Sequence, residues 1–434
     1  PLIGEKLITV APIRARQDAR LTARIRRKAL ALIGDEAQIT LEEPSFFVGS
    51  VDFMVRLDEE TGRLSYVVLE TNGGSSRGTS SLAPREFEQA CGAYQEMLNF
   101  IDGKSPLIVI GGPTGDKLLA EKIYIAQRLK EDLLKRGLCE KARVLPLESF
   151  RGRLEKGEGV VVIGPYDRLV PSLHCLDDQI FLMGHRVNAI IGDGVARRHY
   201  LMCTGQEMDV IVANWTFPIT DDKYMTYRAT QAAMDKLRTF EVYPMRFWRA
   251  KTIDELESTC QEKRQEVGDL IIKPFQGSGG AGVLPVLPDS HIPTVIEESL
   301  GEFREKFSGW QRPFPYTICE KITPRYAIWR DSLRNYDIRI YVARQNNRLI
   351  PLGSLFRVAL HPFTGQFTKK ALVVNLSGYG GIDVERGLGL SKKFLDTVRL
   401  TEEDMVKMFA ASAVLLTFIG RHYKEIVAQA SGSA

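Results

Sequence analysis

The chain has 434 residues, of which 44% are hydrophobic and 26% charged, as is ordinary for a soluble globular protein of two or three domains. Its net charge of +4 is too small to indicate nucleic-acid binding, and no apolar run reaches the roughly 18–20 residues of a membrane span. Six cysteines without a CxxC pair, and no visible secretory signal, lead us to expect reduced thiols and a cytoplasmic protein.

Residues 13–33 have helical character and are rich in Arg and Lys, with seven basic residues between Arg14 and Lys28. A charge run of this kind is usually the solvated face of a helix. An anionic substrate, a protein partner or RNA is the alternative.

The next stretch predicts a β-hairpin, because residues 51–57 and 64–70 alternate in polarity around a turn. With the hairpin tip near Thr61, Asp52 lies opposite Glu70. Side chains repeat every two residues along a strand, so Asn72 lies on the face of Glu70. Two carboxylates and an amide oxygen suit Mg²⁺ that is shared with substrate phosphates. The alternative is an exposed acidic pair beside a turn.

A polar, glycine-rich loop follows the hairpin directly. Its residues Ser75, Ser76 and Arg77 are candidates for binding a carboxylate substrate, although an ordinary loop has the same composition. Residues 83–200 then alternate helical segments with short apolar runs, which indicates an α/β unit with a mostly parallel sheet.

Two lysines lie at positions that suit a phosphate chain. Lys223 is in the first turn of a helix that Asp221 or Asp222 can cap; a cation there opposes the helix dipole unless an anion is nearby. Lys273 ends an apolar run, and a loop with four glycines follows it before a second apolar run. Glycines let backbone N–H groups approach phosphates closely, whereas the alternative is a mobile hairpin tip. The loop candidates for nucleotide binding are Gly277, Ser278, Gly279, Gly280, Ala281 and Gly282.

Three later segments add charged and turn residues. Residues 336–343 alternate as a strand, with Asp337 and Arg339 on one face, and the next strand carries Arg357. Asn375 precedes another glycine-rich turn. Residues 401–428 are helical, with an apolar stripe that we expect in the core.

The order of these motifs resembles the ATP-grasp superfamily. An early lysine, a strand-end lysine and a glycine loop follow one another as in D-alanine–D-alanine ligases. Glu320, Lys321 and Ile322 are similar to the hinge that contacts adenine and ribose in that family. Asp337, Arg339 and Arg357 resemble a strand motif of tubulin–tyrosine ligases and glutamate-adding ligases, and Asn375 with Gly380 and Gly381 resembles their Asn-plus-double-Gly turn.

The sequence also departs from the family. Most members have the metal-binding Asp and Glu-x-Asn last, whereas here Asp52, Glu70 and Asn72 come first. This rotated order resembles eukaryotic glutathione synthetase and glutathionylspermidine synthetase. The arginine that D-alanine ligases carry two residues before the metal Asp is Ser50 here, so Arg339 or Arg357 would take its role. Residues 83–215 match no substrate domain of the family.

The resemblance implies an α/β fold in which an α+β ATP-grasp core of two subdomains grips ATP beside a separate α/β sheet domain. The expected divisions are 1–82, 83–215 and 216–434, with a lid at about 240–315. It also implies a ligase that uses ATP and Mg²⁺ to activate a carboxylate as an acylphosphate and joins it to an amine. We expect amino acids, peptides or polyamines as substrates and no membrane partner; a homodimer is left open. An ATP-dependent kinase on the same fold, or a non-catalytic nucleotide-binding protein, is the alternative function.

Overall fold

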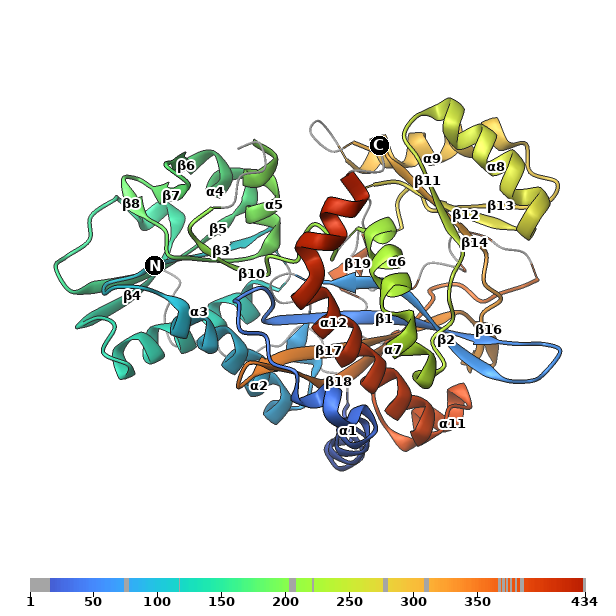
Figure 1. The fold of residues 1–434 in the computed structure, drawn as a ribbon, viewed down its shortest axis with the longest axis horizontal. Helices are drawn as coiled ribbons and strands as arrows, with labels where there is room; N and C mark the ends of the chain where they lie inside the picture. The colour runs from blue at the N-terminus through green and yellow to red at the C-terminus, as the bar shows by residue number, and fades with distance from the viewer. Residues whose placement is uncertain are drawn as a thin grey trace.

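The computed structural model describes residues 16–73, 78–116, 118–202, 208–220, 222–275, 280–307, 312–365 and 386–431, and residues 368, 371, 374, 377–378 and 381–382 between the last two ranges. The described helices and strands form three main sheets with helices packed against them (Figure 1). The α/β fold class predicted from the sequence is therefore confirmed. Among the described residues, no helix is long and apolar enough to cross a membrane.

The first sheet forms the centre of the molecule, and its neighbouring strands are antiparallel. Its strand order is β2 (Leu64–Asn72), β1 (Val48–Leu57), β17 (Tyr336–Gln345), β18 (Arg348–Val358) and β21 (Gly387–Gly389). The predicted hairpin of residues 51–57 and 64–70 is thus confirmed as β1 and β2. Buried Val51, Phe53, Ile338 and Ile340 alternate along two strands and belong to one hydrophobic core. The opposite faces of these strands are therefore left for polar residues near one end.

Helix α12 (Glu402–Ser431) covers that core face, as Figure 1 shows by its course across the central strands. It is a single helix where residues 401–428 were predicted as helical, and Phe409, Val414 and Leu415 of its predicted stripe are buried. Helix α11 (Lys392–Val398) precedes it, and α6 (Lys223–Ala232) and α7 (Met234–Leu237) join the same core.

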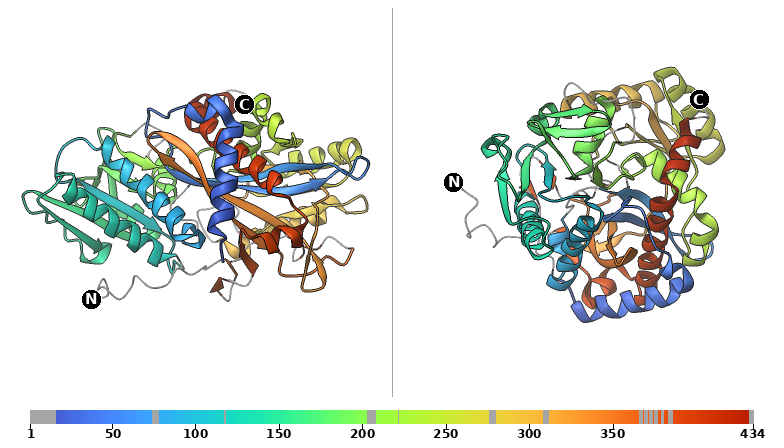
Figure 2. Two further views of the ribbon diagram at one scale, coloured as in Figure 1. Left: turned by 90° about the horizontal axis from the view of Figure 1, so that it is seen from below. Right: turned by 60° about the vertical axis from the view of Figure 1, so that its left-hand side comes forward.

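The basic N-terminal helix α1 (Ala19–Ile33) lies beside α12 (Figure 2). It begins later than predicted, because the Asp18 carboxylate accepts hydrogen bonds from the backbone N–H groups of Arg20 and Leu21, each at 3.0 Å. Its side chains at four-residue spacing are buried, while Arg24 and Lys28 are exposed and bind Glu402. The helix therefore has an apolar face in the core and a solvated basic face.

The second sheet is parallel throughout, as predicted for residues 83–200. Its order is β10 (Ile211–Ala213), β9 (Ala189–Ile191), β3 (Leu107–Gly112), β5 (Glu158–Pro165) and β4 (Lys141–Pro146). One face packs against α2 (Pro84–Glu96) and α3 (Leu119–Lys135) in a core that also includes side chains of β17 and β18. The other face packs against α4 (Tyr166–Ser172) and α5 (Asp193–Met202). A small antiparallel sheet of β6 (Leu173–Leu176), β7 (Gln179–Leu182) and β8 (His185–Arg186) was not predicted.

Buried polar side chains tie this parallel sheet to the hairpin. The Asn214 side chain accepts a hydrogen bond from the backbone N–H of Phe47 at 2.6 Å and donates one to the carbonyl of Val48 at 2.7 Å. The Glu121 carboxylate accepts a hydrogen bond from the Thr79 hydroxyl at 2.6 Å. These contacts hold the start of β1 and the chain that follows β2 in place.

The third sheet is antiparallel, with the order β11 (Phe247–Ala250), β14 (Tyr316–Glu320), β12 (Leu270–Lys273) and β13 (Leu284–Val286). Helices α8 (Ile253–Val267) and α9 (Ile292–Lys306) share its hydrophobic core. The remaining described strands are β15 (Ala327–Trp329), β16 (Ser332–Arg334), β19 (Ser377–Gly378) and β20 (Gly381–Ile382).

Candidate functional site

The hairpin brings Asp52 and Glu70 opposite each other, as the sequence predicts. Between Phe53 and Leu57 the strands pair one residue out of the predicted register, and a bulge that leaves Leu69 unpaired restores it at Asp52. Asn72 lies opposite Ser50 at the end of the same strand. The two carboxylates and the amide therefore meet at one end of the central sheet.

Asp52 is buried in a network of charges built from three neighbouring strands. Arg339 donates to both of its carboxylate oxygens, with Nε–Oδ1 and Nη2–Oδ2 distances of 2.7 Å each. Arg357 donates to Asp52 Oδ2 at 2.7 Å and also to Asp337, at 2.7 Å from Nε and 2.5 Å from Nη2. The network arises because Arg339 pairs with Asp52 on β1, and Arg357 pairs with Asp337 across β17 and β18.

The two carboxylates of this network differ in acidity. Burial opposes the ionisation of Asp52, but Arg339 and Arg357 outweigh burial and hold the pKa of Asp52 well below its usual range. Burial raises the pKa of Asp337 to about 6; Arg357 lowers it, and the negative charge of Asp52 reinforces the rise. Asp52 therefore stays ionised over the usual pH range, whereas Asp337 is more readily protonated.

Glu70 lies in a more open environment than Asp52. Its Oε1 atom is 3.3 Å from Lys223 Nζ, and the side chain is 27% exposed against 3% for Asp52. Lys223 is the first residue of α6, and the Asp222 side chain caps that helix by accepting a hydrogen bond from the N–H of Met225 at 3.1 Å. The structure thus places one predicted phosphate-binding lysine beside one predicted metal ligand.

Lys273 reaches the same helix from the third sheet. It is buried at the end of β12, and its Nζ atom donates a hydrogen bond to the Tyr227 hydroxyl at 2.5 Å. Tyr227 was not singled out in the sequence, but it lies one helical turn after Lys223 and therefore on the same side of α6. That spacing is the signal that could have identified it.

The described end of the glycine loop packs into the third sheet and its helices. Gly282 has φ of 71°, its N–H donates to Glu302 at 2.9 Å, and a Cβ atom there would lie 2.8 Å from the Ser299 carbonyl oxygen. Ala281 is buried, and Gly280 also has a positive φ of 74°. The N–H of Gly282 is therefore already bonded within the protein.

Glu320, Lys321 and Ile322, the residues predicted to contact adenine and ribose, lie where the chain leaves the third sheet. Glu320 is bound by Arg246, whose backbone N–H donates at 2.8 Å and whose Nε donates at 3.0 Å. Lys321 forms an ion pair with Asp269, and Ile322 is 9% exposed. The remaining predicted site residues lie outside the described part of the chain: Ser75, Ser76, Arg77, Gly277, Ser278, Gly279 and Asn375.

The chemistry of the hairpin ligands fits a divalent cation such as Mg²⁺. Glu70 supplies carboxylate oxygens, and so does Asp52, whose two oxygens also accept hydrogen bonds from Arg339 and Arg357. Asn72 supplies an amide whose buried Nδ2 atom makes no hydrogen bond to any described residue. No group of three His, Cys, Asp or Glu side chains able to hold a metal lies in the described part of the chain. A cation here would therefore need the amide oxygen and substrate oxygens to complete its ligands.

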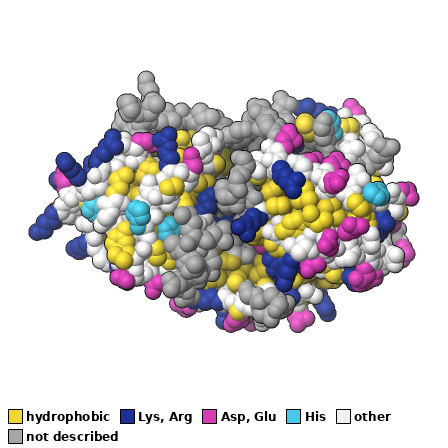
Figure 3. Space-filling view, turned by 90° about the horizontal axis from the view of Figure 1, so that it is seen from above, with side chains coloured by type: hydrophobic (Ala, Val, Ile, Leu, Met, Phe, Trp, Pro, Cys, Tyr) yellow, Lys and Arg dark blue, Asp and Glu magenta, His cyan; other side chains and the backbone are white. Residues whose placement is uncertain are grey.

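The space-filling view in Figure 3 shows Lys and Arg side chains near the middle of one face, beside an apolar area and with Asp and Glu side chains around them.

No family model matches the chain, and no curated protein matches it. Among solved structures, it is similar to a glutathione synthetase-like effector from Globodera pallida, with 12% identity, a TM-score of 0.42, and coverage of 79% of this chain and 82% of the other. It is also similar to D-alanyl-alanine synthetase A from Vibrio cholerae O1 biovar eltor, with 10% identity, a TM-score of 0.35 and coverage of 68% and 78%. A third similar structure is the ATP-grasp ligase PsnB, with 14% identity, a TM-score of 0.23 and coverage of 71% and 98%. These identities and TM-scores are low.

Proposed function

We propose that the protein is an ATP-dependent ligase of the ATP-grasp type, which activates a carboxylate as an acylphosphate and joins it to an amine. One observation carries this proposal: the predicted metal ligands and several cationic side chains lie together at one end of the central sheet. The ligands are Asp52, Glu70 and Asn72 of the hairpin. The cations are Lys223, which pairs with Glu70, and Arg339 and Arg357, which pair with Asp52. The rotated order of these motifs along the sequence is part of the proposal.

In the proposed reaction, an oxygen of the substrate carboxylate attacks the γ-phosphorus of ATP. The bond between that phosphorus and the β–γ bridging oxygen breaks, and ADP leaves. The nitrogen of an amine then attacks the carbonyl carbon of the acylphosphate, phosphate leaves, and the amine loses a proton. Transfer of this kind depends mainly on positioning and on neutralising charge.

The chain's own residues would share that work. Asp52, Glu70 and Asn72 would hold Mg²⁺, which when bound supplies positive charge to the β- and γ-phosphates. Lys223 and Lys273 would bind phosphate oxygens, which requires Lys223 to exchange Glu70 and Lys273 to exchange Tyr227 as partners. The Lys223–Glu70 ion pair is partly exposed, at 17% and 27% of the two side chains.

Arg339 and Arg357 would orient Asp52 and present guanidinium groups to the transferred phosphoryl group or the acylphosphate. Asp337 would position Arg357 through its two hydrogen bonds. Asn375 and the residues Ser75, Ser76 and Arg77 remain proposed substrate-side groups.

An acylphosphate hydrolyses in open water, so the proposal includes a closing lid. The lid would be residues 240–315, which include β11, β12 and β13, with the loop from Gly277 to Gly282 over the phosphates. Glu320, Lys321 and Ile322 would contact the nucleoside. Residues 83–215 would form the substrate domain, and the carboxylate and amine would be small molecules of the amino-acid, peptide or polyamine class.

The test is phosphate release from ATP and Mg²⁺ against a panel of amino acids, small peptides and polyamines, followed by mass spectrometry of the products. We expect release that requires two co-substrates and that falls by about 100-fold or more in Glu70→Gln, because a group that stabilises transferred charge is lost. Glu60→Gln, at the exposed tip of the same hairpin, is the matched control and should keep full activity. A phosphorylated product without phosphate release would establish the kinase alternative, and unchanged activity in Glu70→Gln would overturn the proposed site.

A further inference from the structure

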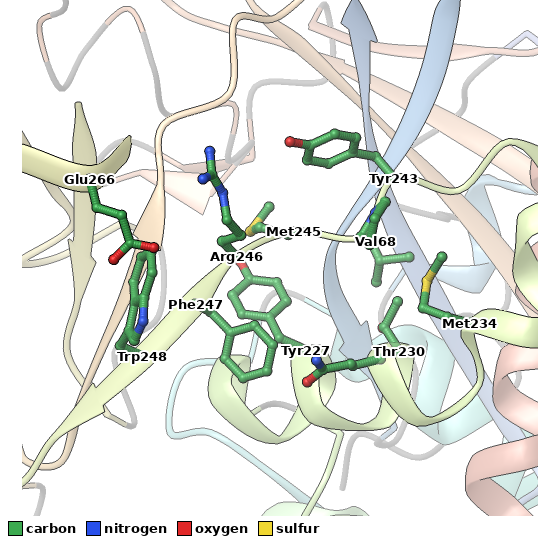
Figure 4. A pocket seen from close by; sticks show the side chains of 12 residues that line it. Val68, Tyr227, Thr230, Met234, Tyr243, Met245, Arg246, Phe247, Trp248 and Glu266 are labelled. Carbon is green, nitrogen blue, oxygen red and sulfur yellow. The ribbon is translucent and has the colours of Figure 1, made fainter. Parts of the chain in front are cut away.

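A cavity of about 330 Å³ lies between α6–α7, the segment that leads into the third sheet, and the edge strand β11 (Figure 4). Its volume is at the lower end of the range of about 300–1,000 Å³ that is typical of small-molecule pockets. Of the predicted site residues that the structure describes, none lines it. The cavity is therefore separate from the charge network around Asp52.

Aromatic rings form much of the cavity wall. Tyr227 and Phe247 pack with their ring centroids 5.5 Å apart, and Trp248 and Tyr243 also line the cavity. The methionines Met234 and Met245 add adaptable apolar surface. A wall of this kind favours a flat, apolar ring, which can stack or pack edge-on against the aromatic groups.

Two side chains of opposite charge line the same cavity. Arg246 and Glu266 each have a side chain that is 52% exposed, so both can meet a ligand and water. Arg246 binds Glu320, and a guanidinium has five N–H donors, so it can serve a second carboxylate as well. Glu266 accepts a hydrogen bond from Lys263 at 3.0 Å, a surface ion pair that contributes little and is readily exchanged.

We propose that this cavity is a binding site for a free aromatic amino acid. The ring would pack at the edge of β11 beside Tyr227 and Phe247. The ligand carboxylate would bind Arg246, and the ligand ammonium group would bind Glu266. Trp248 follows Phe247 along the strand and packs on its other face, under Lys263. A ligand with only one of the two charges would leave one of these side chains without its new partner. A cavity that combines aromatic side chains with one cation and one anion suits a zwitterion with an aromatic side chain.

The cavity lies at a junction between the central and third sheets. The chain enters the third sheet beside β2, where the Tyr243 N–H donates to the Tyr66 carbonyl at 2.9 Å, and it leaves beside Arg246, which binds Glu320. Tyr227 connects the cavity to Lys273, one of the two lysines proposed to bind phosphate. Its ring lines the cavity wall, while its hydroxyl accepts a hydrogen bond from Lys273. A bound ring would fix Tyr227 in this position and so keep Lys273 from a nucleotide phosphate. The amino acid would therefore weaken nucleotide binding, and the nucleotide would weaken amino-acid binding by the same factor.

The binding test does not depend on the proposed ligase function. Calorimetry of the full chain without nucleotide should show L-phenylalanine binding at one site, at least about tenfold more tightly than phenethylamine or 3-phenylpropionate, which each lack one charge. Gln231→Trp, which adds a ring at the cavity, should abolish binding; Gln261→Trp, an equally exposed glutamine of α8, should not. No binding, equal binding of the three compounds, or full binding in Gln231→Trp would overturn the site.

The coupling test adds a non-hydrolysable ATP analogue with Mg²⁺. Saturating L-phenylalanine should weaken the binding of the analogue by about fivefold or more, and Tyr227→Phe should remove this effect while it keeps the ring in the cavity wall. The same analogue affinity with and without L-phenylalanine in the wild type would overturn the coupling. Failure of the analogue to bind at all would count against the proposed function, and the amino-acid site would be judged by the first test alone.

Discussion

Asp52 and Glu70 face each other on adjacent strands, yet their surroundings are opposite in character. Asp52 is almost fully buried, and two arginines occupy its oxygens. Glu70 is partly exposed and has a longer contact to one lysine. The comparison teaches that two residues predicted to bind the same metal have different surroundings: Asp52 joins three strands through its arginines, whereas Glu70 is partly open to solvent.

The largest effect on stability should come from removing the buried carboxylate of Asp52. In Asp52→Asn the guanidinium groups of Arg339 and Arg357 lose a buried anion, so the free energy of unfolding should fall by about 3–5 kcal/mol. Urea unfolding followed by circular dichroism measures this change, with Glu59→Gln at the hairpin tip as the control. An unchanged urea midpoint in Asp52→Asn would mean that the arginines do not depend on this carboxylate.

Removing Lys223, the partner of the partly exposed Glu70, should affect ligand binding more than folding. Lys223→Met should weaken the binding of a non-hydrolysable ATP analogue by about tenfold to 100-fold, because a hydrogen bond to a charged group contributes about 1.5–3 kcal/mol. Lys236→Met in the neighbouring helix α7, whose lysine pairs with Glu36, is the matched control. Equal weakening in both variants would point to a general loss of positive charge.

The pKa of Asp337 is raised, whereas that of its buried neighbour Asp52 is lowered, so the two carboxylates should change stability with pH in opposite directions. The pKa of Asp337 is raised to about 6 in the folded protein, above the value near 4 of an unfolded chain, so the folded state binds a proton more tightly. This contribution to stability is present below about pH 4 and is lost as the pH rises through 6, by roughly 3 kcal/mol. Relative to Asp337→Asn, the wild type should therefore lose stability between pH 4 and 6, as measured by the difference between the two urea midpoints at each pH. A wild type that gains stability relative to the variant over this range would reverse the sign of the assigned shift.

The smallest effect should come from an exposed ion pair far from this network. Glu402 binds Arg24 and Lys28 of the basic helix α1, and exposed pairs of this kind contribute little to stability. Glu402→Gln should leave the urea midpoint within experimental error of the wild type. A clear drop would show that the basic face of α1 depends on this contact.

The local features of the site could be predicted from the sequence, because short-range periodicity determines them. The alternation of residues 51–57 and 64–70 predicted the strand pair. Asp52 meets Glu70 as predicted only because the bulge at Leu69 corrects a register that was predicted one residue out. The alternation of residues 336–343 placed Arg339 on the polar face, away from Ile338 and Ile340 of the core.

The partners that close the network could not be predicted, because they depend on contacts between distant segments. Arg339 lies 287 positions along the chain from Asp52, and only the pairing of β1 with β17 brings the two together. The bulge at Leu69 has no local sequence signal, although it sets which residue faces Asp52. The four-residue spacing from Lys223 could have placed Tyr227 on the same side of α6, but its contact with Lys273 depends on how the third sheet lies against that helix.

The most direct test of the central claim is calorimetric binding of a non-hydrolysable ATP analogue to wild type and to Glu70→Gln, each with Mg²⁺ and with EDTA. We predict that Mg²⁺ strengthens binding to the wild type by about tenfold or more, and that Glu70→Gln removes this gain while the protein keeps its urea midpoint. The same gain from Mg²⁺ in both proteins would contradict the assignment of the metal and nucleotide site to the hairpin.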